Sequence, residues 1–139
     1  MSCILRVSGK ALDIDALTSS FAVPAHRTWR IGETRSVISG RVHSDSGANF
    51  VASNADFDAF TQQVEDATAF LESNVLAIGK LASFPGVEQV TLDFGVAFLQ
   101  ESVAAFSYLP PKLVALAAQA RIGVEISHYA CSQEHGAEG

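Results

Sequence analysis

The chain has 139 residues, of which 48% are hydrophobic and only 17% are charged. This length suits one domain with its own core, and the composition excludes disorder over most of the chain. Nine basic residues stand against fifteen acidic ones, which gives a formal net charge of −6. The scattered basic residues lack the charge pattern of a nucleic-acid binder and also disfavour a membrane surface as partner.

The apolar runs and the cysteines indicate the compartment. No apolar run approaches the ~20 residues that span a bilayer, and the apolar stretch after Met1 is too short for a signal peptide. Cys3 and Cys131 fit no CxxC pattern of metal or redox sites. We therefore expect a cytoplasmic protein with free thiols.

The first predicted elements are a strand and a short helix. Residues 3–8 alternate between apolar and polar side chains, which is typical of a strand. Asp13 is a suitable N-cap for a helix that ends near Phe21, because its carboxylate can accept hydrogen bonds from the first turn. Residues 23–35 show neither the helical nor the strand periodicity of apolar residues and are predicted to form an ordered loop.

A hairpin and two helices follow. Residues 37–43 and 49–53 are predicted to form a hairpin, since Ser-Asp-Ser-Gly between them is turn sequence. From about residue 56, apolar side chains recur at steps of three and four, which predicts a helix. A second, shorter helix is predicted over residues 75–83.

The last third alternates strand and helix. Residues 87–97 alternate strongly and predict a half-buried strand. Pro110 and Pro111 open a helix, and Gly123 is placed where a left-handed C-terminal residue is often found. The final strand is predicted over residues 124–130.

This order of elements predicts an α+β fold with a single, mostly antiparallel sheet. We expect its helices on one face, as in a ferredoxin-like fold with an added C-terminal helix and strand. Residues 1–131 form the predicted domain, and residues 132–139 form a flexible polar tail. The opposite face is expected to be polar and to carry Arg6, Arg41, His43, Thr91, Asp93, Glu125, Ser127 and Tyr129.

Short motifs along the chain resemble a bacterial family catalogued as domain of unknown function 4279. They are LRVSGKALD at residues 5–13, Pro24, WRIGE at residues 29–33, and IGVEI at residues 122–126 followed by Tyr129. The resemblance implies a single α+β domain, and no reaction is established for the family as a whole. Bacterial families of this size include immunity proteins that neutralise toxins, which suggests that role by analogy of class.

Two carboxylates are candidates for catalysis. Asp93 and Glu125 would be neighbours on the polar face if their strands pair, and paired carboxylates can act as general acid and base. Arg41 and His43 complete this candidate catalytic set. The structural alternative is that Arg6 or Arg41 forms solvated ion pairs with the two carboxylates.

The histidines and cysteines do not indicate a metal site. No two histidines have the helical i, i+4 spacing, and neither HExxH nor CxxC occurs. No metal and no cofactor are therefore predicted.

The loop around the single tryptophan is the candidate binding site. His26, Arg27, Trp29 and Arg30 lie close together there, and Trp and Arg often dominate binding energies. The alternative is a tryptophan that closes the end of the core, with arginine stems packed over its ring.

The leading hypothesis is a non-enzymatic binding or protein-interaction module, with another protein as partner, of which the immunity type is one example. The alternative is a small-molecule-binding protein or an enzyme that uses the polar sheet face. A homodimer is a third hypothesis, because an unpaired edge strand and a mean hydropathy of +0.23 both favour covering apolar surface.

Overall fold

A computed structural model describes residues 1–131, so the predicted tail over residues 132–139 lies outside the described residues. Its elements are β1 (Cys3–Gly9), α1 (Ile14–Ser20), β2 (Arg27–Trp29), β3 (Thr34–Ser36), β4 (Arg41–Val42), β5 (Ser46–Ser53), α2 (Phe60–Leu81), β6 (Gln89–Leu99), α3 (Pro111–Gln119) and β7 (Gly123–Cys131).

Five strands form the main sheet, in the order β2-β5-β1-β6-β7. Three neighbouring pairs are antiparallel, and only β6 and β7 run parallel. Parallel neighbours need a long crossover connection, which α3 and the segment before it provide. The prediction of an α+β fold with a mostly antiparallel sheet is confirmed.

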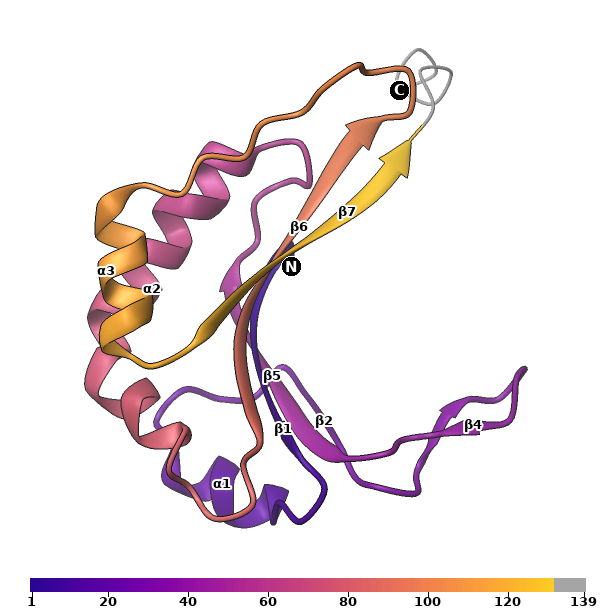
Figure 1. Cartoon of the computed structure of the whole chain (residues 1–139). Coiled ribbons are helices and arrows are strands. Elements are labelled where there is room, and N and C mark those ends of the chain that lie inside the picture. The colour runs from indigo at the N-terminus through magenta and orange to yellow at the C-terminus, as the bar shows by residue number, and fades with distance from the viewer. Residues whose placement is uncertain (132–139) are drawn as a thin grey trace.

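The core lies between this sheet and the helices. Leu5 stands at its centre on β1, with Phe50 of β5 and Leu92 of β6 as its partners on the two neighbouring strands. All three are fully buried, together with Leu71 and Ile78 of α2. Figure 1 shows α2 and α3 on one side of the sheet, while the segment that carries β4 projects on the other side.

The caps and the length of the helices follow from local chemistry and from packing. The Asp13 carboxylate accepts a hydrogen bond from the Ala16 amide, as expected of the N-cap of α1. The prediction of two helices over residues 56–83 is wrong, because α2 continues through Gly79 as one helix. Ile78 and Leu81 are buried on either side of this glycine, and their packing outweighs its weak helix propensity.

The predicted hairpin is also wrong. Residues 37–40 form a turn in which Val37 and Ile38 are almost fully exposed. β3 and β4 pair only with each other, in a separate two-stranded sheet. β5 instead pairs with β1 and β2, where its apolar side chains reach the core.

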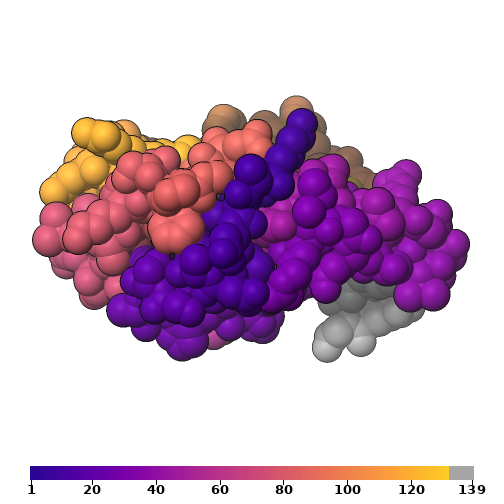
Figure 2. Space-filling view, turned by 90° about the horizontal axis from the view of Figure 1, so that it is seen from below, coloured from indigo at the N-terminus to yellow at the C-terminus, as the bar shows by residue number. Residues whose placement is uncertain are grey.

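We call residues 34–42 the arm. Figure 2 shows the purple residues of this region on the opposite side of the indigo first strand from the pink helix residues. The arm contributes no residue to the core cluster. Its position is therefore set by its base and not by apolar packing.

In the C-terminal part, the predicted strand, helix and strand are all present, and the structure differs from the prediction at one turn. α3 begins at Pro111, as predicted. The left-handed residue after α3 is Arg121, with φ of 59°, whereas Gly123 already begins β7. Within residues 1–131, no helix is both long and apolar enough to cross a membrane.

Candidate functional site

Strand pairing aligns side chains of four neighbouring strands on the sheet face turned away from the core. Successive side chains of a strand point to opposite faces, so the neighbours of the buried Leu5 and Phe50 reach this open face. One row of paired residues is Arg27, Asn49, Arg6 and Thr91, and the next row is Trp29, Gly47, Ser8 and Gln89.

Trp29 lies over Gly47, its partner on β5. A Cβ atom at Gly47 would lie 2.5 Å from the Val7 carbonyl oxygen and closer still to the indole ring, so only glycine leaves room for this ring. The indole Nε1 donates a hydrogen bond to Asp45 Oδ1 at 3.0 Å. The ring also stacks on His43, with ring centroids 5.7 Å apart and an interplanar angle of 23°.

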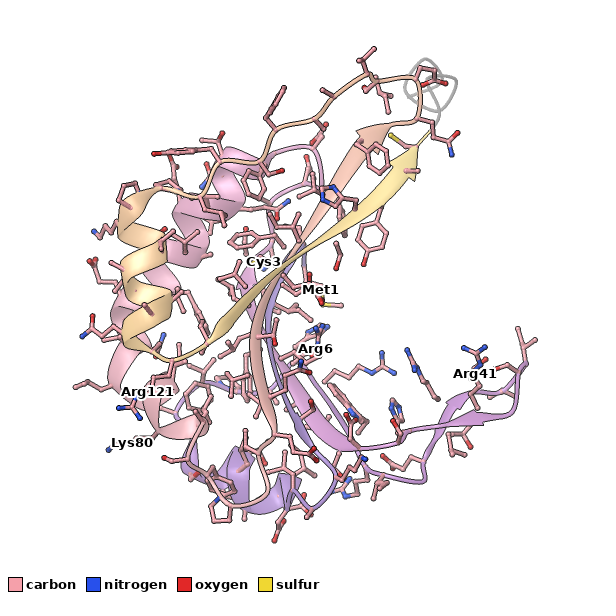
Figure 3. The ribbon with its side chains drawn as sticks, in the orientation of Figure 1. Met1, Cys3, Arg6, Arg41, Lys80 and Arg121 are labelled. Atoms are coloured by element: carbon pink, nitrogen blue, oxygen red, sulfur yellow. The ribbon has the colours of Figure 1, made fainter. Side chains whose placement is uncertain are left out.

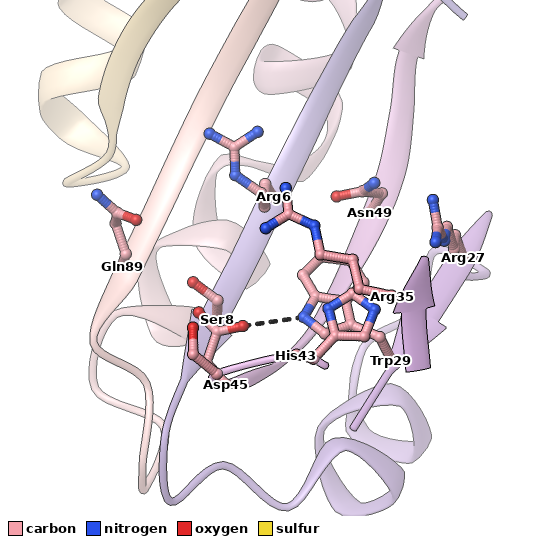
Figure 4. A pocket seen from close by; sticks show the side chains of 10 residues that line it. Arg6, Ser8, Arg27, Trp29, Arg35, His43, Asp45, Asn49 and Gln89 are labelled. Atoms are coloured by element: carbon pink, nitrogen blue, oxygen red, sulfur yellow. Dashed lines mark hydrogen bonds between the residues drawn. The ribbon is translucent and has the colours of Figure 1, made fainter. Parts of the chain in front are cut away.

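These rows and the base of the arm line an open hollow of about 390 Å³. Figure 4 shows Trp29 and His43 stacked beside Arg35, with Arg27, Asn49 and Arg6 coming from three adjacent strands of the sheet. We call this hollow the arginine hollow. Its lining residues are Arg6, Ser8, Arg27, Trp29, Arg35, His43, Ser44, Asp45, Asn49 and Gln89.

The arginine hollow contains two guanidinium groups without an ion-pair partner among the described residues. Arg27 and Arg35 form no ion pair with any residue in 1–131. Asp45 is the acidic residue of the lining, and its carboxylate already accepts the indole hydrogen bond. Two guanidinium groups at one hollow can bind a carboxylate or a phosphate. Each guanidinium can donate a pair of parallel hydrogen bonds to such an anion.

Asn49 adds an unused polar group between Arg27 and Arg6 in the row of paired residues. Its side-chain oxygen is buried and has no hydrogen-bond partner among the described residues. A buried polar atom of this kind normally has a partner in a protein, a water or a ligand. Because a flip of the amide exchanges its oxygen and nitrogen, Asn49 can accept from or donate to a ligand.

Arg6 links the arginine hollow to the two candidate carboxylates. Its guanidinium donates to Asp93 at 3.2 Å and to Glu125 at 3.0 Å, and the Ser127 hydroxyl donates to Asp93 at 2.8 Å. Desolvation lowers the pKa of Arg6, but the hydrogen bonds and charges of Glu125 and Asp93 outweigh it and raise the pKa overall. The charge of Arg6 is thus already balanced.

The four residues predicted for catalysis do not come together. Asp93 and Glu125 are partners on β6 and β7. Arg41 lies in β4 on the arm, and His43 stacks on Trp29, so neither belongs to the main sheet. The expectation that Arg41 and His43 lie on the sheet face is wrong because residues 37–43 do not join this sheet.

The four residues predicted for binding divide into two pairs. Arg27 and Trp29 line the arginine hollow. Arg30 instead forms an ion pair with Asp15 at 2.6 Å, and the hydrogen bond from Arg30 to Asp15 raises the pKa of the guanidinium. His26 is exposed outside the lining, and its backbone amide donates to the Asn49 carbonyl at 2.8 Å.

The sequence did not identify Arg35, Asn49 and Asp45 as site residues. Arg35 stands in the same aperiodic loop as Trp29, which was a weak signal for it. Asn49 reaches the site only because β5 pairs with both β1 and β2. Comparisons with family models, with curated proteins and with solved structures found no match to this chain.

Proposed function

We propose that this protein is a non-enzymatic binding module that holds a small anionic ligand in the arginine hollow. The observation that carries the proposal is the pair Arg27 and Arg35, which have no ion pair in residues 1–131 and stand beside the stacked ring of Trp29. Guanidinium forks suit a planar carboxylate or a phosphate, because each fork can donate paired hydrogen bonds. The volume of about 390 Å³ lies in the range of small-molecule sites.

The state of the carboxylates favours binding over catalysis. A general acid and base must be free to exchange a proton with a substrate. Asp93 accepts hydrogen bonds from both Arg6 and Ser127, and Glu125 accepts one from Arg6. Both carboxylates are thus already engaged by side chains of the protein, so an enzyme based on Asp93 and Glu125 is the less favoured alternative.

Trp29 allows a direct test, since it is the only tryptophan of the chain. We expect its fluorescence to change in a saturable way when the protein is titrated with inorganic pyrophosphate or with citrate. The anion with the lower dissociation constant identifies the ligand class as phosphate or carboxylate. A linear response, or none, to both anions would show that the hollow binds neither class.

A pair of matched variants assigns the binding to the arginines. Arg27→Gln combined with Arg35→Gln removes two charge-assisted donors, so we expect the affinity to fall about a hundredfold, as about 1.5 kcal/mol for each of the two lost bonds implies. Lys80→Gln combined with Lys112→Gln removes the same net charge from α2 and α3, outside the arginine hollow. Figure 3 shows Lys80 on the helix side, away from Arg6. An equal loss of affinity in both double variants would contradict the assignment.

Three further predictions belong to this proposal. The motifs around Trp29 and Gly32 support kinship with the family of domain of unknown function 4279, and a member with a different strand order would contradict it. A ferredoxin-like relationship and a cytoplasmic location also stay predictions. The ferredoxin-like relationship rests on the order of elements.

A further inference from the structure

The two edges of the main sheet differ sharply in length and protection. β2 forms one edge with three residues, and β7 forms the other with nine. Long edge strands present unpaired backbone groups, and proteins protect them with lysine, proline or a bulge. β7 contains neither residue type, and its register with β6 runs through nine pairs without a shift.

The β7 edge carries one formal charge, that of Glu125, and is partly apolar. Its one carboxylate, Glu125, is bound by Arg6 on the same sheet face. Val124 and Tyr129 remain 38% and 55% exposed. An edge with little unbalanced charge can pair with an identical edge, since no strong like charges are brought together.

The backbone of β7 shows which groups face outward. The Gln100 amide donates to the Cys131 carbonyl, so Cys131 turns its backbone groups toward β6. Along a strand, the backbone N–H and C=O groups of successive residues point alternately to one edge and to the other. The backbone groups that point outward, away from β6, are therefore those of Val124, Ile126, His128 and Ala130. Within residues 1–131, no strand pairs with this side of β7.

We propose that two copies of the chain pair through antiparallel β7 strands, with the two-fold axis at Ser127, and so join their sheets into one. This register is the one that places all four outward-facing residues in hydrogen-bonded pairs. Ile126 then faces His128 of the partner subunit, and Val124 faces Ala130 of the partner subunit. Glu125 lies opposite Tyr129 of the partner subunit, so no two like charges lie opposite each other in the paired strands. A two-fold dimer is also the commonest way in which identical edges are closed.

The mass in solution is the first test. Light scattering at micromolar concentrations should give about twice the chain mass of 14.7 kDa. A mass of one chain at every concentration would overturn the proposal.

Variants with added charges test the position of the two-fold axis at Ser127. Val124→Lys with Ala130→Lys places like charges opposite each other twice in the dimer, so we expect the dissociation constant to rise about tenfold. Val124→Lys with Ala130→Glu places opposite charges at the same positions and should retain the dimer. If the dissociation constant of the dimer rises equally in both variants, or rises in neither, this register is contradicted.

Hydrogen exchange tests the same register in the unaltered chain, so it does not depend on how the variants fold. The amides of Ile126 and His128 should exchange more slowly as the protein concentration rises, because they are paired only in the dimer. The Ser127 amide faces β6 and should exchange slowly throughout. Exchange of Ile126 and His128 that is independent of concentration would overturn the proposal.

Discussion

At the scale of single residues, Arg6 organises the open face of the sheet. Its side chain is 28% exposed and lies between Asp93, which is 13% exposed, and Glu125, which is 53% exposed. An ion pair in contact with water contributes little to stability, whereas a buried charge that loses its partner is costly. The two carboxylates therefore differ in what they contribute, although the same arginine binds both.

We predict that Asp93→Asn destabilises the protein more than Glu125→Gln. The first change weakens the more buried pair and should lower the free energy of unfolding by about 1–2 kcal/mol, while the second should change it by less than about 0.5 kcal/mol. Urea unfolding monitored by circular dichroism measures both. Equal effects of the two changes would show that burial does not distinguish the carboxylates.

Cys3 gives the stability a dependence on alkaline pH. Burial, aided by the charges of Asp93 and Asp66, raises the pKa of the Cys3 thiol far above its ordinary value of 9.0. Above pH 9.0 the unfolded chain loses a proton that the folded protein keeps, so the stability is complete below this pH and falls as the pH rises. The slope contributed by one such group reaches at most about 1.4 kcal/mol per pH unit.

We therefore predict a flatter alkaline profile for Cys3→Ala. The free energy of unfolding of the unaltered protein, measured on both sides of pH 9.0, should fall more steeply than that of the variant. Cys131 is only partly buried, so Cys131→Ala controls for the loss of a thiol in general. If Cys3→Ala and the unaltered protein have the same slope, the thiolate of Cys3 does not limit alkaline stability.

At the scale of elements, the arm is held by its base. The Gly32 amide donates to the His43 carbonyl at 2.9 Å, and the His43 amide donates to the Glu33 carbonyl at 2.8 Å. The tip carries Val37 and Ile38, which are 91% and 101% exposed. The arm contributes Arg35 to the arginine hollow and no side chain to the core.

Replacement of residues 34–42 by Asn-Gly should keep the fold and weaken anion binding. Glu33 and His43 already face each other, so a two-residue turn can join them as in a tight hairpin. We expect the melting temperature to change by no more than about 3 °C, since no core residue is lost. The affinity for the anion should fall as far as in Arg35→Gln alone. Unfolding of the shortened chain would show that the arm supports the core.

Elements with strong local signals could be predicted from the sequence. α1 has its Asp13 cap, α3 has Pro111 at its start, and β1 has clear alternation. The error over residues 37–43 arose because the β-branched Val37 and Ile38 resemble a strand although no neighbouring strand covers them. Serine and glycine at positions 46 and 47 resemble a turn, but the Trp29 ring requires a glycine in β5.

The arginine hollow could be predicted only in part for a similar reason. Arg27 and Trp29 are two residues apart on β2, which places them on one face of the sheet. Asn49, Ser8 and Gln89 join them through pairings between distant strands. Such registers depend on the packing of the whole sheet, and a single sequence does not reveal them.

At the scale of the whole molecule, the site contrasts with the chain around it. The net charge is −6, yet the arginine hollow contains two guanidinium groups without ion pairs among residues 1–131. The acidic surface repels anions at a distance, so local hydrogen bonds must provide the affinity. Selectivity for an anion at this one place is the central claim of the function proposed above.

Nuclear magnetic resonance of the arginine side chains tests this claim most directly. On titration with pyrophosphate or citrate, the Nε–Hε signals of Arg27 and Arg35 should shift and saturate together with the Trp29 indole signal. Arg30, bound to Asp15, and Arg121, on the helix side, should not shift. Unchanged signals of Arg27 and Arg35, or equal and unsaturated shifts of all arginines, would contradict a specific anion site in the arginine hollow.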